Sequence, residues 1–310
     1  MLRTGKLYQV QLPIPSLQMD TSMKPVREKV MSEAEWKETI ARACARDDGV
    51  PEEAPYQGPV QLALWRDRER AVPTAIIRSA LFGIVRPGRR RYLEDQPIAC
   101  WKNCEIKYTG GQLDQYDQDV WMQVLHLFRQ QDLSAQNGIR FTLRGFLKSM
   151  GTSSSGKSTR ALYRSLKRLT ATAVSIRIGF CTYVGSLIES FVEDEATGRY
   201  VVRLNPQVAG LFGAGYTKME AQTRRGFTTD LARWLYGYVQ SHKATQKQPH
   251  RIGLAKLQAI TGSETELKDF RRKVRRAMEE LQRAGVVASW RITDGDALEF
   301  VRPRGRRIAA

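Results

Sequence analysis

The chain has 310 residues, of which 42% are apolar, and this is enough to build the cores of two modest domains. Lys and Arg outnumber Asp and Glu by 50 to 32, so the formal net charge of +18 predicts attraction to a polyanion, nucleic acid before an anionic membrane. No apolar run approaches the roughly 20 residues of a membrane-spanning helix, and the first residues lack the apolar stretch of a signal peptide, so we expect a cytoplasmic protein.

The N-terminal residues are predicted to form an arm that is partly disordered. Residues 1–30 show no apolar period. A capping box and apolar residues at four-residue spacing predict one amphipathic helix over residues 31–45. Pro and Gly make residues 51–60 a linker. Short strands are expected at 98–101 and 106–108.

The four cysteines and three histidines do not form a recognisable framework. Only Cys100 and Cys104 lie close together, as a single C-x3-C pair. We therefore expect reduced thiols, no metal and no other cofactor. Catalytic triads and paired carboxylates do not stand out either, so we expect no enzymatic activity.

An apolar pattern that begins at about Asp117 occurs twice in the chain. Residues 119–151 match residues 230–262 at a constant offset (119 to 230, 151 to 262), and residues 162–173 match 270–281. Each copy predicts a helix, a short helix, a turn and a longer basic helix. Strands are expected afterwards at 173–178, 183–192 and 200–204 in the first copy, and at 286–292 and 297–301 in the second.

Three helices followed by a β-hairpin are typical of a winged helix-turn-helix. The predicted class is therefore α+β, with two such domains in tandem. We expect the arm at residues 1–70, the first domain at 71–215 and the second at 216–310.

The stretch Gly151–Ser158 matches the pattern of a phosphate-binding loop, G-x-x-x-x-G-K-[ST]. Such a loop must follow a buried strand, yet Phe146, Leu147 and Met150 have helical spacing. We therefore interpret the stretch as the turn of a helix-turn-helix, in which Ser155 or Ser158 caps the next helix. Nucleotide binding through Lys157 remains a remote alternative.

The helix expected from Lys157 to about Ala171 has an apolar face and a cationic face. Residues 139–180 contain nine basic residues and no acidic one, which suits a DNA backbone better than a merely solvated surface does. The N-terminal residues of this helix are placed to reach the edges of DNA bases. The candidate DNA-binding residues here are Lys157, Ser158, Thr159, Arg160, Tyr163, Arg164, Lys167 and Arg168.

The second copy predicts an equivalent helix after Gly262. Its candidate DNA-binding face comprises Lys268, Arg271, Arg272, Lys273, Arg275 and Arg276. Weaker candidates on the hairpins are Arg199, Arg203, Arg291, Arg302 and Arg304.

From Val72 to Arg302 the chain resembles the TrfA-type replication initiators of broad-host-range bacterial plasmids. The resemblance rests on an ordered series of short matches: Arg78–Phe82, Ile106–Gly110, Val120–Trp121, Val124–Leu125, Leu169–Ala173, Leu211–Phe212, Tyr216–Lys218, Leu257, Gly262–Ser263, Ala277, Glu279–Leu281 and Gly285–Val286. A second resemblance is the pentapeptide with Gln61, Leu62, Leu64 and Trp65, which is similar to the family's peptide for docking on the bacterial sliding clamp. Ordinary packing is the alternative role for these four residues.

The resemblance implies binding of double-stranded DNA at direct repeats, called iterons, of a plasmid origin. It also implies opening of an A·T-rich segment, recruitment of the host replicative helicase and sliding clamp, and control of plasmid copy number. Family members bind DNA as monomers and are inactive as dimers. A winged-helix transcriptional repressor is an alternative that the sequence leaves open.

Overall fold

The structure, a computed structural model, describes residues 65–303 apart from 87, 102–103, 131–137, 179–180 and 195–196. By their contacts, Gly58–Ala310 form one unit. The predicted helix 31–45, the linker 51–60, the side chains of Gln61, Leu62 and Leu64, and Arg304 lie outside the described residues.

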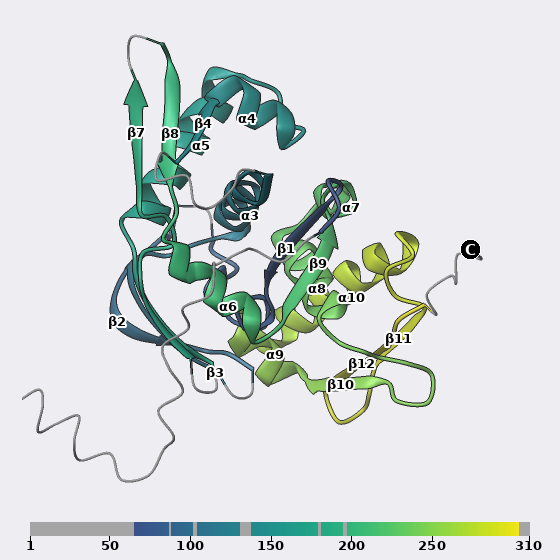
Figure 1. Cartoon of the computed structure of the whole chain (residues 1–310). Helices are drawn as coiled ribbons and strands as arrows, with labels where there is room; N and C mark the ends of the chain where they lie inside the picture. The colour runs from purple at the N-terminus through teal and green to yellow at the C-terminus, as the bar shows by residue number, and fades with distance from the viewer. Residues whose placement is uncertain are drawn as a thin grey trace, which may run out of the picture. The chain divides into compact units, whose positions relative to one another are not determined.

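Two segments share one order of elements, apart from two strands that are inserted after the long basic helix of the first (Figure 1). The first repeat comprises α3 (Gln115–Gln130), β4 (Ile139–Thr142), α4 (Leu143–Ser149), α5 (Gly156–Thr170), β7 (Ser190–Asp194) and β8 (Arg199–Arg203). The second repeat comprises α8 (Asp230–Gln240), β10 (His250–Gly253), α9 (Leu254–Thr261), α10 (Leu267–Arg283), β11 (Ser289–Ile292) and β12 (Ala297–Val301). Their sheets are also ordered alike, β4-β8-β7 and β10-β12-β11. The repeat predicted from the apolar pattern is therefore confirmed.

The cores of the repeats use the matched apolar positions. Leu162, Leu166 and Leu169 of α5 are buried, and so are their counterparts on α10, Phe270, Val274 and Ala277. Burial of such side chains is the main favourable term in folding. The match fails at Ala173, which is exposed and begins a strand, whereas Leu281 is buried within α10. The reason is that α5 ends at Thr170 and α10 continues to Arg283.

A separate antiparallel sheet has the order β2-β3-β5-β6. Its strands are β2 (Tyr92–Ile98), β3 (Cys104–Gly111), β5 (Ala173–Ile178) and β6 (Cys181–Gly185). One expectation is wrong here, because residues 183–192 do not form one strand. The chain leaves this sheet after Gly185, buries Leu187 and Ile188, and enters the other sheet as β7. A run of apolar residues predicted a strand but not the change of sheet.

Another pairing was not expected from the sequence. Strand β1 (Glu69–Pro73) pairs antiparallel with β9 (Tyr216–Glu220), with Glu69 opposite Glu220. The remaining elements are α2 (Thr74–Ile77), η1 (Pro206–Ala209), α6 (Gly210–Gly213) and α7 (Ala221–Gly226). The boundary expected between residues 215 and 216 stays a prediction. Among the described helices, none has the length and apolar character to cross a membrane.

Candidate nucleic-acid interface

Two main-chain donors at the start of the turn, the N–H groups of Gly151 and Thr152, are committed to the fold. The N–H groups of Gly151 and Thr152 donate to carbonyl oxygens of α4, each at 2.9 Å. Ser155 caps α5, because its Oγ accepts the N–H of Ser158 at 3.2 Å. A phosphate loop would need such N–H groups to face a ligand. The element before the turn is also helix α4, not a strand, so the geometry favours the helix-turn-helix interpretation.

The two turns have the same backbone conformation at matched glycines. Gly151 has φ +69° and Gly262 has φ +67°, in the left-handed region that favours glycine at the end of a helix. The sequence match between these glycines therefore corresponds to one shared way of ending the first helix of each pair.

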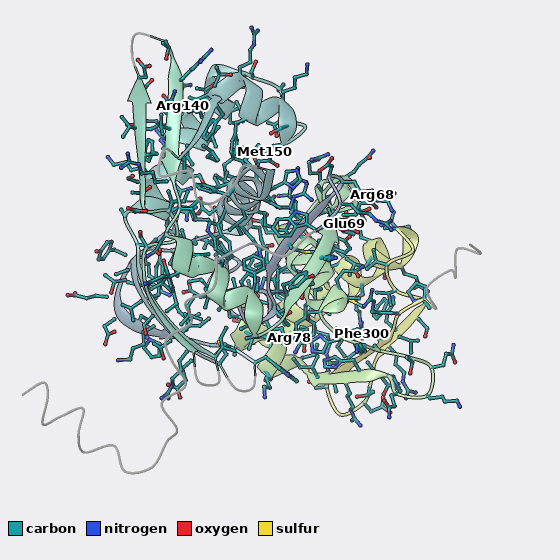
Figure 2. All side chains as sticks on the ribbon, in the orientation of Figure 1. Arg68, Glu69, Arg78, Arg140, Met150 and Phe300 are labelled. Atoms are coloured by element: carbon teal, nitrogen blue, oxygen red, sulfur yellow. The ribbon has the colours of Figure 1, made fainter. Side chains whose placement is uncertain are left out.

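Most of the predicted cationic face of α5 is open to solvent. Lys157, Arg160, Arg164 and Lys167 are exposed, and Ser158 and Thr159 at the start of the helix are half-buried. Tyr163 is exposed as well, and its ring contacts Phe191 of β7 edge to face, at 5.6 Å between centroids. In the all-side-chain view, Arg140 and Met150 mark β4 and the end of α4 in this repeat (Figure 2).

Arg168, predicted to face DNA, has a structural partner instead. Its Nε and one terminal nitrogen donate to the carboxylate of Asp117 at 3.1 and 2.6 Å, and Asp117 is fully buried on α3. The side chain of Arg168 thus joins α5 to α3. Helical spacing alone placed Arg168 on the open face because it could not show the acidic partner 51 residues earlier.

The second cationic face is also largely exposed. Lys268, Arg272, Lys273, Arg275 and Arg276 of α10 are open to solvent. Arg272 forms an ion pair with Asp269 one turn earlier, at 2.9 Å. Arg271 is half-buried and pairs with Asp296 in the loop between β11 and β12. The second predicted site is thus brought together on one helix, with Arg271 also holding the hairpin loop.

The arginines of the two hairpins differ in whether their side chains are free to contact DNA. Arg199 and Arg203 of β8 are exposed. Arg291 pairs with Glu299 across its hairpin at 3.0 Å. Arg302 donates to the carbonyl oxygens of Gln240 and His242, at 3.2 and 3.1 Å, so it serves the packing of the second repeat.

The aromatic residue of the clamp-like peptide is part of the core. Trp65 is only 4% exposed, stacks on Phe212 at 6.0 Å, and donates from Nε1 to Nδ1 of His126 at 3.1 Å. Burial, followed by the charges of Arg70 and Arg129, lowers the pKa of His126 to about 4. The neutral ring of His126 can therefore accept this hydrogen bond, and docking of Trp65 on another protein would require this segment to detach.

The histidines of the second repeat are packed rather than ligating. The rings of His242 and His250 lie 3.8 Å apart, and burial lowers their pKa values to about 3 and about 4. In the described part of the chain, no group of three or more His, Cys, Asp or Glu side chains is placed to hold a metal ion.

Known proteins resemble this chain over most of the described residues. The profile of the family described as TrfA protein matches residues 57–299. The plasmid replication initiator protein TrfA of Escherichia coli is 30% identical over 236 residues, which are 73% of this chain and 60% of that protein. The chain thus spans less than two thirds of the length of that relative.

Two solved structures show weaker likeness. A structure of domains 2 and 3 of RctB has a TM-score of 0.49 at 13% identity, covering 74% of this chain and 98% of that one. A structure of the Pi initiator protein in complex with iteron DNA has a TM-score of 0.42 at 12% identity, covering 60% of this chain and 91% of that one.

Proposed function

This chain belongs to the TrfA protein family, and we propose that it initiates plasmid replication by binding iterons at a plasmid origin. The family resemblance expected from the sequence is thereby confirmed. The relative of known function is named a plasmid replication initiator, which supports the same role for this chain.

We further infer that each repeat is a winged helix-turn-helix domain. In support, each has a helix pair joined by a turn, α4–α5 or α9–α10, and a two-stranded hairpin that pairs with the strand before that helix pair. In such domains the second helix of the pair enters the major groove and presents its N-terminal residues to the bases.

The observation that carries the proposal is the pair of exposed cationic helix faces. On α5, Lys157, Arg160, Arg164 and Lys167 all point away from the core, and α5 contains no acidic residue. On α10, the exposed cations extend along the helix in the same way. Each Lys or Arg that neutralises a phosphate releases counterions, so the two faces together predict strongly salt-dependent DNA binding.

Fluorescence anisotropy of the full chain on labelled duplexes tests this proposal. The duplexes should tile the DNA beside its gene, with a shuffled sequence for comparison. If six to ten phosphates are contacted, the affinity should fall about 10³- to 10⁵-fold between ~50 and ~200 mM salt. Arg160→Ala and Arg164→Ala should weaken binding. Arg177→Ala is the matched control, because Arg177 is an exposed cation on the four-stranded sheet, paired with Glu105.

A flat salt dependence would contradict the proposal, and so would equal effects of the Arg164→Ala and Arg177→Ala changes. Loss of binding that is confined to one base position would identify a base contact, whereas a uniform loss would identify a phosphate contact.

The proposal extends to origin opening, helicase recruitment and an inactive dimer, which the family resemblance supports. It also extends to the sliding clamp through the peptide Gln61–Trp65. Replacing Gln61 and Leu62 with Ala should abolish capture of the full chain by immobilised bacterial clamp. Unchanged capture would remove the peptide from the proposal and leave Trp65 with its packing role alone.

A further inference from the structure

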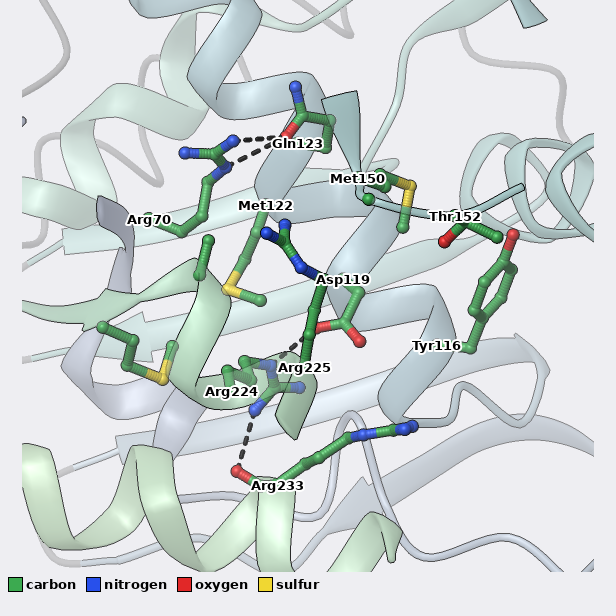
Figure 3. A pocket seen from close by; sticks show the side chains of 13 residues that line it. Arg70, Tyr116, Asp119, Met122, Gln123, Met150, Thr152, Arg224, Arg225 and Arg233 are labelled. Atoms are coloured by element: carbon green, nitrogen blue, oxygen red, sulfur yellow. Dashed lines mark hydrogen bonds and ion pairs between the residues drawn. The ribbon is translucent and has the colours of Figure 1, made fainter. Parts of the chain in front are cut away.

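A cavity of about 230 Å³ lies beside the turn that leads into α5. Its wall combines α3 and the Gly151–Thr152 turn with Arg70 of β1, α7 and the start of α8 (Figure 3). The volume is several times the roughly 30 Å³ that one water molecule occupies in the liquid. Segments of the first repeat, of β1 and α7, and of α8 in the second repeat therefore share one cavity.

The cavity has an excess of positive charge. Four arginines line it, Arg70, Arg224, Arg225 and Arg233, against one carboxylate, Asp119. Arg224 is buried and neutralised, because its Nε donates to Asp119 at 2.6 Å and its other nitrogens reach Gln115, Gln118 and a carbonyl oxygen.

Arg233 pairs with Asp230 at 3.2 Å, whereas the charges of Arg70 and Arg225 are less well compensated. Arg70 donates to neutral acceptors, the amide oxygen of Gln123 at 3.0 and 2.7 Å and two main-chain carbonyls. Burial, and then the charges of Arg225 and Arg129, lower the pKa of Arg70 to about 10. Within the described part of the chain, Arg225 has no hydrogen bond or ion pair, and it is exposed. The positive charges of these arginines therefore repel one another, and a bound anion would offset this repulsion.

Two donors at the cavity lack acceptors. Among the described residues, neither the buried hydroxyl of Tyr116 nor the buried Nε of Arg233 has a hydrogen-bond partner. Both residues line the cavity. Buried donors without acceptors are costly, and a ligand rich in oxygen acceptors would satisfy them.

The guanidinium of Arg225 lies against the turn at Gly151. A Cβ at Gly151 would lie 3.1 Å from Nε and Cζ of Arg225, so the glycine leaves room for this close contact. Planar guanidinium groups bind phosphate with paired hydrogen bonds. The turn itself continues directly into α5, the helix whose cationic face we expect to lie in the DNA groove.

We propose that this cavity is a phosphate-binding site, built by Arg225 with Arg70, Arg233 and Tyr116, and that its ligand is a phosphate of the DNA backbone. The identification of the ligand as a DNA phosphate, rather than a free phosphate, rests on the proposed function. One phosphate then contacts the turn of the first repeat and the segment α7–α8 together, and so fixes the spacing between the two cationic helices on the duplex.

Duplex binding by three variants tests the proposal. Arg225→Gln removes an exposed cation that has no partner among the described residues, Arg164→Gln removes one from α5, and Arg177→Gln is the control on the sheet. Arg225→Gln should weaken binding about tenfold and reduce the salt slope by about one, as expected for one lost phosphate contact. Circular dichroism and thermal unfolding should show that all three variants are folded.

Thermal unfolding with inorganic phosphate or ATP, at matched ionic strength, distinguishes the phosphate sources. Phosphate should raise the midpoint of the wild-type chain and not that of Arg225→Gln. If ATP shifts the midpoint through Arg225 while duplex affinity is unchanged, the site binds a free nucleotide and the DNA source is overturned. If Arg164→Gln weakens duplex binding and Arg225→Gln changes neither binding nor midpoint, the site is refuted and the proposed function stands. If neither variant weakens duplex binding, both fail.

Discussion

Replacing Asp117 with Asn should remove the strongest polar link between α3 and α5. The fully buried carboxylate accepts hydrogen bonds from Ser165 at 2.6 Å, from Arg168 at 2.6 and 3.1 Å, and from Arg90 at 3.1 Å. It also accepts the main-chain N–H of Asp114 at 3.1 Å. Asn has nearly the same shape, but it carries no charge and has an NH2 donor in place of one acceptor oxygen. The change therefore removes the charge together with at least two of the accepted hydrogen bonds.

The expected loss in the free energy of unfolding depends on the two arginines that remain without their carboxylate. Removing one partner of a buried ion pair costs about 3–5 kcal/mol, because the other charge stays buried. The side chains of Arg168 and Arg90 keep 22% and 29% of their exposure, so water can partly replace the carboxylate. We therefore expect a loss at the lower end, about 3 kcal/mol. This corresponds to a fall of roughly 6–12 °C in Tm at 2–4 °C per kcal/mol.

Urea unfolding followed by tryptophan fluorescence and by circular dichroism measures this loss. The midpoint should fall while the slope stays constant. Asp95→Asn is the control, because Asp95 is 72% exposed and pairs only at the surface with Lys107 at 3.0 Å, an interaction worth about 0–1 kcal/mol.

A loss for Asp117→Asn no larger than that of the control would refute the reasoning. The same is true of a double-mutant cycle with Arg168→Gln in which the two losses simply add, because directly paired side chains should show a coupling energy.

Three other outcomes are expected. Trp65→Ala should lower the free energy of unfolding by about 3–5 kcal/mol in urea, since the ring is buried against Phe212; no change would mean that Trp65 lies outside the core. Acidification from pH 7.5 to 5 should destabilise the chain by up to about 2 kcal/mol for each of His126 and His242. In the fold their pKa values are about 4 and about 3, below the ordinary histidine pKa of 6.5 that the unfolded chain keeps, so on acidification the unfolded chain takes up protons first. A urea midpoint that stays constant over this pH range would contradict the burial of these two neutral rings. Cys100, whose pKa is lowered to about 7 by the hydrogen bond with Cys104, should be alkylated by iodoacetamide with a midpoint near pH 7, and mass spectrometry that finds its midpoint near pH 9 would disprove this.

Local patterns in the sequence were sufficient to predict the helices of the two repeats, but not the short helices α2, α6 and α7. The turn at Gly151, the cap at Ser155 and the buried face with Leu162 depend on residues within a few positions of one another. The same locality explains why α5 was predicted to within one residue of its observed ends. The repeat added a second, independent copy of the same pattern and so strengthened the prediction.

Partners far apart in sequence could not be predicted in this way. Helical spacing placed Arg168 and Arg271 on exposed faces, but the acids that engage them, Asp117 and Asp296, come from other elements. The cationic cavity was missed for the same reason. The only local signal for it was the adjacent pair Arg224 and Arg225, of which one is neutralised and buried and the other is exposed.

The pairing of β1 with β9 has a consequence for synthesis on the ribosome. Glu69 pairs with Glu220, so β1 leaves the ribosome about 150 residues before its partner strand exists. At 5–20 residues per second this interval is roughly 8–30 s. During that time Ala71 and Val72, fully buried in the finished fold, lack the strand with which their main-chain groups pair. The nascent chain is therefore most exposed to aggregation, and most suited to chaperone binding, before the ribosome reaches β9.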